Sequence, residues 1–222
     1  MKEKRITLIL SIALAVCAGA TIPTLISSIP PIEPYSVKSE VPYCVTPPSV
    51  PEQATFDGET IDLRRYDRRE RMDREMMSFT YMHSTTMLML KRANRYFPIV
   101  EPILKANGIP DDFKYLMVIE SSLNPIARSP AGAAGLWQFM PATGREFGLE
   151  VNDNIDERYN VEKATVAACK YFKQAYEKYG DWMAVSAAYN AGQGRITAQL
   201  DKQLADHAMD LWLVEETSRY MF

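Results

Sequence analysis

Apolar residues recur at helical spacing over most of the chain beyond residue 90, with polar residues at the positions between them. This pattern predicts helices over the ranges 94–106, 161–179 and 182–189. A further helix is predicted to begin at Asp111, whose side chain would cap it, and to carry the stretch YLMVIESSLNP (115–125). Gly108 and Gly180 supply stop signals. With no convincing alternating strand and no internal repeat, the predicted fold class is all-α.

A segment dense in mixed charge precedes these helices. It reads IDLRRYDRRERMDREMM (61–77), with acidic and basic residues at helical spacing. Its arginines suggest a binding patch. The interleaved acids, which form i,i+4 pairs at Asp67/Arg71 and Glu70/Arg74, favour a solvent-exposed helix face instead.

The first 58 residues differ from the rest of the chain in composition. Three basic residues precede an apolar run (6–16), and Ala18-Gly19-Ala20 offers a small-x-small cleavage site, which is typical of a secretory signal peptide over 1–20. Residues 21–58 hold eight of the fourteen prolines and predict an extended linker. A folded domain is then predicted over 59–222, with a helical extension (59–95) and a core (96–222).

The signal predicts an exported protein of the periplasm or cell envelope. Cys17 closes the apolar run as the lipidated cysteine of a bacterial lipoprotein would, but Val16 precedes it, where such signals have a small side chain. Membrane association is therefore expected only if Cys17 is lipidated.

The charge of the mature chain bears on its partners. Cleavage after Ala20 would remove three of the 25 basic residues and one of the 28 acidic residues, which leaves 22 and 27, a net charge of −5. An acidic protein lacks the broad basic surface of a nucleic-acid binder, so no nucleic-acid partner is expected.

Cysteine and histidine are sparse. Cys44 lies in the Pro-rich segment and Cys169 in a predicted helix, which favours a linker thiol and a small buried residue over a disulfide. His83 and His207 are the only histidines and belong to no clustered Cys/His pattern. Neither a metal site nor a cofactor is predicted.

Glu120 is the residue with the clearest candidate chemistry. It ends an apolar run, and a 3.6-residue wheel places it on one stripe with Phe113, Leu116, Met117 and Leu123. Burial and the negative end of the helix dipole both disfavour its anion, so its pKa is expected to rise. A carboxyl protonated at neutral pH suits a general acid for glycoside cleavage. On helix position alone, a Glu that turns toward a neighbouring base or N–H remains the better interpretation.

Two later stretches add to this picture. SPAGAAGLWQFMPATG (129–144) surrounds Trp137 and Gln138 with small residues that let backbone approach backbone or ligand closely. AAYNAGQG (187–194) places Tyr189-Asn190 ahead of two glycines at a helix end. Each is compatible with plain packing or capping when taken alone.

Five blocks together resemble the lytic transglycosylases of the soluble-transglycosylase type. They are GIPDDFKYLMVIESSLNP, SPAGAAGLWQFMPATGREFGL, DERYNVEKAT, DWMAVSAAYNAGQGRI and EETSRY, in this order from about residue 96 to the end. The chain departs from the family at Gln193, where Pro is common, and in ending at Phe222, where the family usually continues.

The resemblance implies a goose-lysozyme-like helical domain with a glycan cleft. It implies that Glu120 is the single catalytic acid/base, and that Ser121 stands beside it. The other positions that match the family's cleft are Ser129, Gln138, Met140, Tyr189, Asn190, Glu216 and Tyr220. The implied partner is the peptidoglycan glycan strand, cut at the β-1,4 bond between N-acetylmuramic acid and N-acetylglucosamine.

A second carboxylate would indicate an ordinary glycosidase, which uses two. Asp153, Asp156 and Glu157 are candidates but fit turn and capping roles at least as well, and the resemblance assigns them no role as nucleophile. The prediction is thus non-hydrolytic cleavage that closes a 1,6-anhydro ring on muramic acid. The alternatives are a hydrolytic muramidase on the same fold and a non-catalytic glycan-binding envelope protein.

Overall fold

The computed structural model describes residues 48–221, which belong to one compact unit (Thr46–Phe222). The predicted signal peptide, Cys17, Cys44 and the linker up to residue 47 lie outside the described residues. Within them the protein is mostly helical, as the sequence predicts, with one small exception at the start.

That exception is a β-hairpin. Strands β1 (Gln53–Phe56) and β2 (Glu59–Asp62) pair antiparallel around Asp57 and Gly58, which both have positive φ. Asp-Gly is the preferred pair for such a two-residue turn. The expectation of no strand was therefore wrong here, and β1 falls within the segment expected to be an extended linker. Phe56 packs against the core, which ties the hairpin to the helices.

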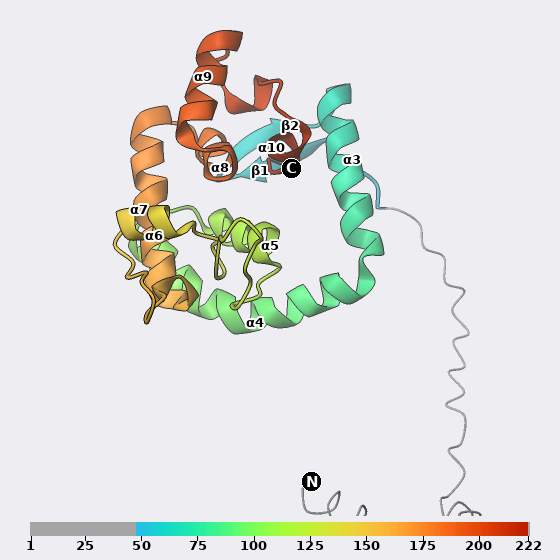
Figure 1. Ribbon diagram of the computed structural model, residues 1–222. Helices are drawn as coiled ribbons and strands as arrows, with labels where there is room; N and C mark the ends of the chain where they lie inside the picture. The colour runs from blue at the N-terminus through green and yellow to red at the C-terminus, as the bar shows by residue number, and fades with distance from the viewer. Residues whose placement is uncertain (1–47, 222) are drawn as a thin grey trace, which may run out of the picture. The chain divides into compact units, whose positions relative to one another are not determined.

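Two long helices form one side of the unit. α3 (Tyr66–Tyr81) leads almost directly into α4 (His83–Ala106), and the two stand as the arms of a corner in Figure 1. The end of α4 matches the prediction, but its start lies eleven residues earlier than 94. Pro98 and Pro102 both lie inside it, although proline is disfavoured in a helix interior.

The stretch with Glu120 is less regular than predicted. A 3₁₀ helix, η1 (Asp111–Tyr115), is followed by the short helix α5 (Leu116–Ser121), which ends in the left-handed residue Ser122. Asp111 does not cap it, because its carboxylate pairs with Lys114. The predicted stripe nevertheless holds: the four apolar members of the wheel are at most 3% exposed.

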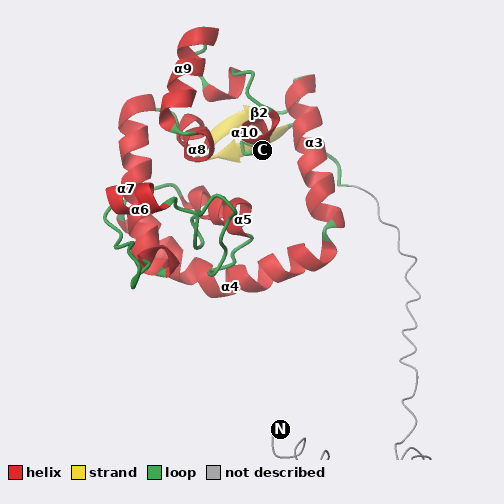
Figure 2. Cartoon of the chain, viewed as in Figure 1, coloured by secondary structure: helices red, strands yellow, loops and turns green. Residues whose placement is uncertain are grey.

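A long loop and four helices complete the core. Figure 2 shows the loop that precedes α6 (Pro141–Glu146), which is followed by η2 (Glu157–Tyr159). The predicted helix over 161–179 is found with the same bounds as α7 (Val161–Tyr179), capped by Asn160 and stopped by Gly180. The predicted helix over 182–189 is α8 (Trp182–Ala191).

The chain then turns back toward α3. α9 (Gln193–Gln203) and η3 (Ala208–Asp210) lead to the short helix α10 (Glu215–Arg219), which lies near α3 in Figure 1. A main cluster of apolar side chains packs around Phe113, Trp137 and Phe172. Cys169 belongs to it as a fully buried thiol, the small buried residue that the sequence predicts. No helix within residues 48–221 is both long and apolar enough to cross a membrane.

The charges of α3 also have partners outside the predicted i,i+4 pairs. Asp67 pairs with Arg65, and Arg74 pairs with Glu75 and with Glu215 of α10. The face is therefore partly a contact between the two ends of the domain rather than only a solvated surface.

Candidate active site

Glu120 lies between two depressions in the surface. Cavity 1, of about 600 Å³, is lined by residues of α5, α6, α7, α8 and α9 together with the loop before α6. Cavity 2, of about 520 Å³, is lined by residues of α3, α4, α5, α8 and α10. Only Glu120 and Asn190 line both. A ligand longer than one cavity would therefore pass across the Glu120 carboxyl.

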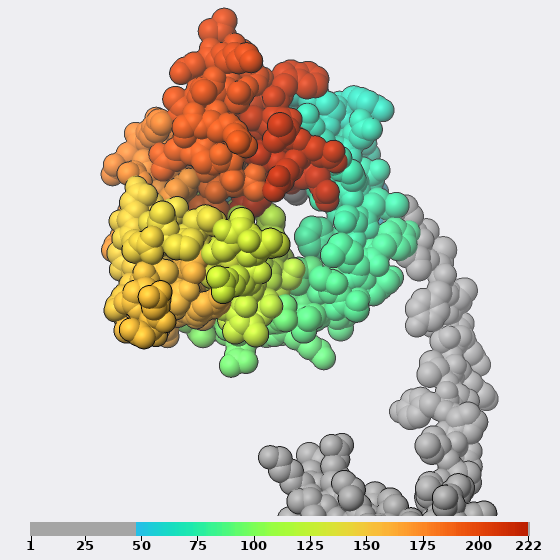
Figure 3. Space-filling view, in the orientation of Figure 1, coloured from blue at the N-terminus to red at the C-terminus, as the bar shows by residue number. Residues whose placement is uncertain are grey.

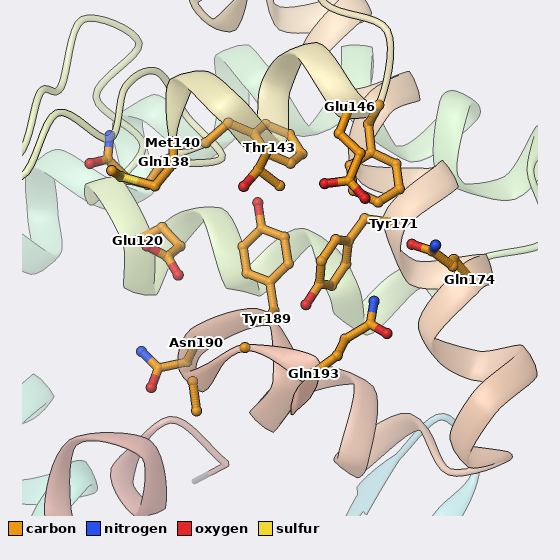
Figure 4. A pocket seen from close by; sticks show the side chains of 14 residues that line it. Glu120, Gln138, Met140, Thr143, Glu146, Tyr171, Gln174, Tyr189, Asn190 and Gln193 are labelled. Atoms are coloured by element: carbon orange, nitrogen blue, oxygen red, sulfur yellow. The ribbon is translucent and has the colours of Figure 1, made fainter. Parts of the chain in front are cut away.

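A space-filling view and a close view of the side chains agree with this arrangement. Figure 3 shows a hollow where α3, the segment around α5 and the C-terminal segment face one another. Figure 4 shows cavity 1 from close by, with Glu120 and Asn190 toward one end of the view and Glu146 and Gln174 toward the other.

The pKa of Glu120 is raised from 4.5 to about 7. Burial of the carboxyl is the largest cause, because a low-polarity environment disfavours the anion. The Tyr220 hydroxyl opposes it by donating a hydrogen bond of 2.9 Å to Oε1, and the negative charge of Glu216 raises the pKa further. Near neutral pH the group is thus divided between its acid and base forms.

The aromatic residues around Glu120 are fixed by packing. The Tyr189 hydroxyl donates a 2.6 Å hydrogen bond to the backbone oxygen of Trp137, and its ring packs against Tyr171 and Phe172. Tyr220 is 6% exposed. Burial raises the pKa of Tyr189 and of Tyr220 well above the ordinary value, so both hydroxyls stay protonated as donors.

The structure brings six more of the sequence-predicted residues to the cavities. Gln138, Met140 and Tyr189 line cavity 1, Glu216 and Tyr220 line cavity 2, and Asn190 lines both. Gln138 adopts a positive φ of 48° and donates through Nε2 to the backbone oxygens of Ala127 and Gly135. These hydrogen bonds fix its side chain within a tight loop.

Ser121 and Ser129 do not line either cavity. The Ser121 hydroxyl donates to the Met117 backbone oxygen one turn earlier in its own helix. The Ser129 hydroxyl accepts from the Ala133 N–H and so closes the loop that carries Gln138. Both therefore hold backbone near the site in this structure.

The small residues of the loop serve the backbone rather than a ligand. A Cβ on Gly135, whose φ is 79°, would lie 1.9 Å from the Arg158 backbone oxygen. Arg158 is 5% exposed and donates to the backbone oxygens of Gly132 and Phe139, and Asp156 holds its guanidinium through both oxygens. The loop is thus fixed around the buried arginine, with glycine where its backbone contacts the backbone of Arg158.

The three carboxylates considered as a second catalytic group lie elsewhere. Asp156 caps η2 and pairs with Arg158, while Glu157 accepts the Glu150 N–H and pairs with Lys163. Asp153 is exposed in the preceding loop. The predicted turn and capping roles are confirmed for Asp156 and Glu157, and none of the three lines cavity 1 or cavity 2.

Sequence reasoning missed several residues that line the cavities. In cavity 1 they share helix faces: Thr143 and Glu146 follow Met140 at helical spacing on α6, and Tyr171 and Gln174 are spaced i,i+3 on α7. That spacing could have located them. Glu75 and Arg219 of cavity 2 could not be found this way, because they are 144 residues apart.

No group of three or more His, Cys, Asp or Glu side chains within residues 48–221 could hold a metal ion.

Comparison with known proteins identifies relatives. The model of the Transglycosylase SLT domain family matches residues 97–209. Membrane-bound lytic murein transglycosylase D of Escherichia coli (strain K12) is 33% identical over 158 residues, which cover 69% of this chain and 34% of that protein. Soluble lytic murein transglycosylase of the same strain is 34% identical over 94 residues, 39% of this chain and 15% of that protein. The chain therefore spans about a third of the first relative's length.

A solved structure supports the fold. The 70 kDa soluble lytic transglycosylase from Escherichia coli aligns with a TM-score of 0.51 at 20% identity, over 72% of this chain and 29% of that chain. The predicted lysozyme-like helical fold is confirmed.

Proposed function

The chain belongs to the Transglycosylase SLT domain family, and from that premise we propose that it is a peptidoglycan lytic transglycosylase. Its substrate is the glycan strand, and it cleaves the β-1,4 bond between N-acetylmuramic acid and N-acetylglucosamine without water. The observation that carries the proposal is Glu120, a mostly buried carboxyl with a pKa of about 7 that lies between two cavities.

Glu120 acts first as an acid. Because Tyr220 donates to Oε1, the acid proton is free to lie on Oε2 and to pass to the glycosidic oxygen. The bond from that oxygen to C1 of muramic acid then breaks. The substrate's own N-acetyl group stabilises the positive charge that develops at C1, as in substrate-assisted glycosidases.

Glu120 then acts as a base. It takes the proton from the 6-hydroxyl of muramic acid, whose oxygen bonds to C1 and closes the 1,6-anhydro ring. The carboxyl ends in its starting state, and no water is consumed. A pKa near neutrality suits both steps, since neither protonation state is strongly disfavoured.

The surrounding side chains bind and orient the glycan. Gln138, Met140, Tyr189 and Asn190 offer hydrogen-bonding and apolar contacts along cavity 1, and Glu216 and Tyr220 do so in cavity 2. Ser121 and Ser129 act indirectly by holding the backbone of α5 and of the Gln138 loop. Consistent with this substrate, we propose that the protein is exported to the periplasm or cell envelope.

The experiment that tests the function is a digest of purified peptidoglycan followed by mass spectrometry. We expect fragments with 1,6-anhydro-muramic ends, which are lighter than reducing ends by one water molecule. The Glu120→Gln variant should release neither. Reducing ends alone would indicate a hydrolytic muramidase on the same fold, and binding without cleavage would indicate a glycan-binding protein.

A further inference from the structure

Glu75 of α3 is a buried carboxylate with an unusual set of partners. It is 8% exposed, and it lies on cavity 2. Arg219 of α10 donates to it through two nitrogens, with Nε 2.7 Å from Oε1 and Nη2 3.0 Å from Oε2. Arg74 adds a longer contact of 3.3 Å to Oε1. Burial raises the pKa of Glu75, but the pairing with Arg219 outweighs it and holds the pKa below its usual range, so Glu75 stays ionised.

The partner, Arg219, is the last residue of α10 and directly precedes Tyr220. Tyr220 is the donor to the Glu120 carboxyl. α10 also carries Glu216, whose charge acts on Glu120. The position of this one short segment therefore decides how the catalytic carboxyl is contacted from the side of cavity 2.

A helix of five residues cannot hold that position by itself. Helices shorter than about 12 residues are marginal in water, so α10 depends on tertiary contacts. Buried Thr217 and Ser218 fix one face of it against the body of the domain. The bidentate pair with Glu75 fixes its end, next to Tyr220. Both α3 and α10 lie outside the matched residues 97–209.

We propose that Glu75 is a positioning residue for the reaction at Glu120, acting through Arg219 to keep the Tyr220 hydroxyl on Oε1 of that carboxyl. The proposal rests on the proposed function for its kinetic consequences, but its structural consequence holds whatever reaction Glu120 performs. By this proposal α3 contributes to the geometry of the site and is not only an N-terminal extension of the domain.

The test must separate a change of position from a change of charge. The double variant Glu75→Gln/Arg219→Gln removes one negative and one positive charge, so the net charge near Glu120 stays the same. Tyr220→Phe removes the donor directly, and the triple variant combines both changes. Asp67→Asn is the matched control, because it also breaks an ion pair of α3, the one with Arg65. Arg219→Lys, which keeps the positive charge but cannot donate to both oxygens of Glu75 in the same way, serves if the double variant does not fold.

The first readout is the titration of the Glu120 carboxyl by ¹³C NMR in the absence of substrate. Tyr220 and Glu216 are the groups that shift its pKa, the charge of Glu120 in turn acts on Tyr189, and none of these three residues is changed in the double variant. Because the Tyr220 hydrogen bond lowers the pKa of Glu120, we expect the double variant and Tyr220→Phe both to raise it. An unchanged titration in the double variant would overturn the proposal.

The second readout is the rate of glycan cleavage. We expect the double variant to lose between about 10-fold and 100-fold in kcat, with KM changed by less than about twofold. The triple variant should be no slower than Tyr220→Phe, since both changes remove the same contact. Losses that multiply, or a rise in KM alone, would show that Glu75 acts on the substrate or the fold instead. If the wild-type protein yields no anhydro ends, the proposed function fails while the titration still decides the role of Glu75.

Discussion

Two carboxylates of this domain meet opposite environments. Glu120 is largely buried between two cavities, and its carboxyl accepts a hydrogen bond from the neutral hydroxyl of Tyr220. Asp156 lies against the buried guanidinium of Arg158, which contacts both of its oxygens at 2.7 and 2.8 Å. Burial raises the pKa of Glu120 to about 7, whereas the hydrogen bonds from Arg158 lower the pKa of Asp156.

The difference separates the proposed catalytic carboxyl from a structural one. A buried acid without a cation holds its proton and is able to give it to a substrate. An acid bonded to a cation is fixed as an anion, and its contribution is to stability. The pair Asp156–Arg158 accordingly organises the loop that carries Gln138, through the oxygens of Gly132 and Phe139.

The strongest way to break the comparison is to remove each carboxylate in turn. Glu120→Gln should lower the cleavage rate by roughly 100-fold to 10,000-fold, because a positioned general acid contributes that much. The rate of turbidity loss of purified peptidoglycan measures it. Asp156→Asn should lower the rate much less, because Asp156 acts on the loop that carries Gln138 and not on the glycosidic bond. A Glu120→Gln variant that cleaves at near the wild-type rate would exclude Glu120 as the acid.

Asp156→Asn should have its main effect on stability. It leaves the Arg158 guanidinium, which is 5% exposed, without its counter-ion, and the free energy of unfolding should fall by about 3 kcal/mol. Chemical denaturation at neutral pH measures this change. Asp62→Asn breaks the exposed pair of Asp62 with Arg64 and serves for comparison. A loss of stability in Asp156→Asn no larger than in Asp62→Asn would show that the Asp156–Arg158 pair does not stabilise the fold.

The pH dependence of stability should differ in sign between the two sites. The pKa of Glu120 in the folded protein is raised, so its contribution to stability is complete below pH 4.5 and is lost as pH rises through about 7. At about 1.4 kcal/mol per pH unit, ionisation costs up to about 3 kcal/mol at pH 8. Glu120→Gln should therefore be more stable than the wild type at pH 8 and equal to it at pH 4.

For Asp156 the sign is reversed. Its pKa in the folded protein is lowered, so its contribution is complete above the pKa of the unfolded chain and is lost as pH falls. The stability difference between the wild type and Asp156→Asn should shrink on acidification. Denaturation curves at pH 8 and pH 4 measure the effect of Glu120, and a further curve below pH 3.8 measures that of Asp156. Changes of the same sign in the two variants would contradict the assignment.

The smallest expected shift along the pH axis comes from the Tyr220 hydroxyl. Tyr220→Phe removes a hydrogen bond that lowers the pKa of Glu120, so this pKa should rise further by up to about one unit. The alkaline limb of the pH–rate profile should move upward by the same amount. Tyr179→Phe removes another partly buried hydroxyl, which donates to Gln193, and should leave the limb in place. A limb that moves downward would mean that Tyr220 does not donate to the anion.

Some features follow from the sequence alone because their causes are local. Asn160 and Gly180 fix both ends of α7, through a side-chain cap at the start and a left-handed residue at the end. The apolar stripe of the Glu120 segment is buried as predicted, since amphipathic spacing depends only on neighbours in the chain. The Asp-Gly pair of the hairpin turn is an equally local signal, although the flanking strands show no clear alternation of apolar and polar residues.

Other features depend on residues far apart in the chain. The partners of α3 include Glu215 and Arg219 of α10. The sequence by itself determined which carboxyl would be driven inward and the helical class of the fold. Only the tertiary structure decided that Tyr220 would reach Glu120 across 100 residues and that α3 would hold the segment in place. The spacing of residues along the sequence determines which side chains share a face of a helix. The partner of each side chain depends on how segments far apart in the sequence pack together.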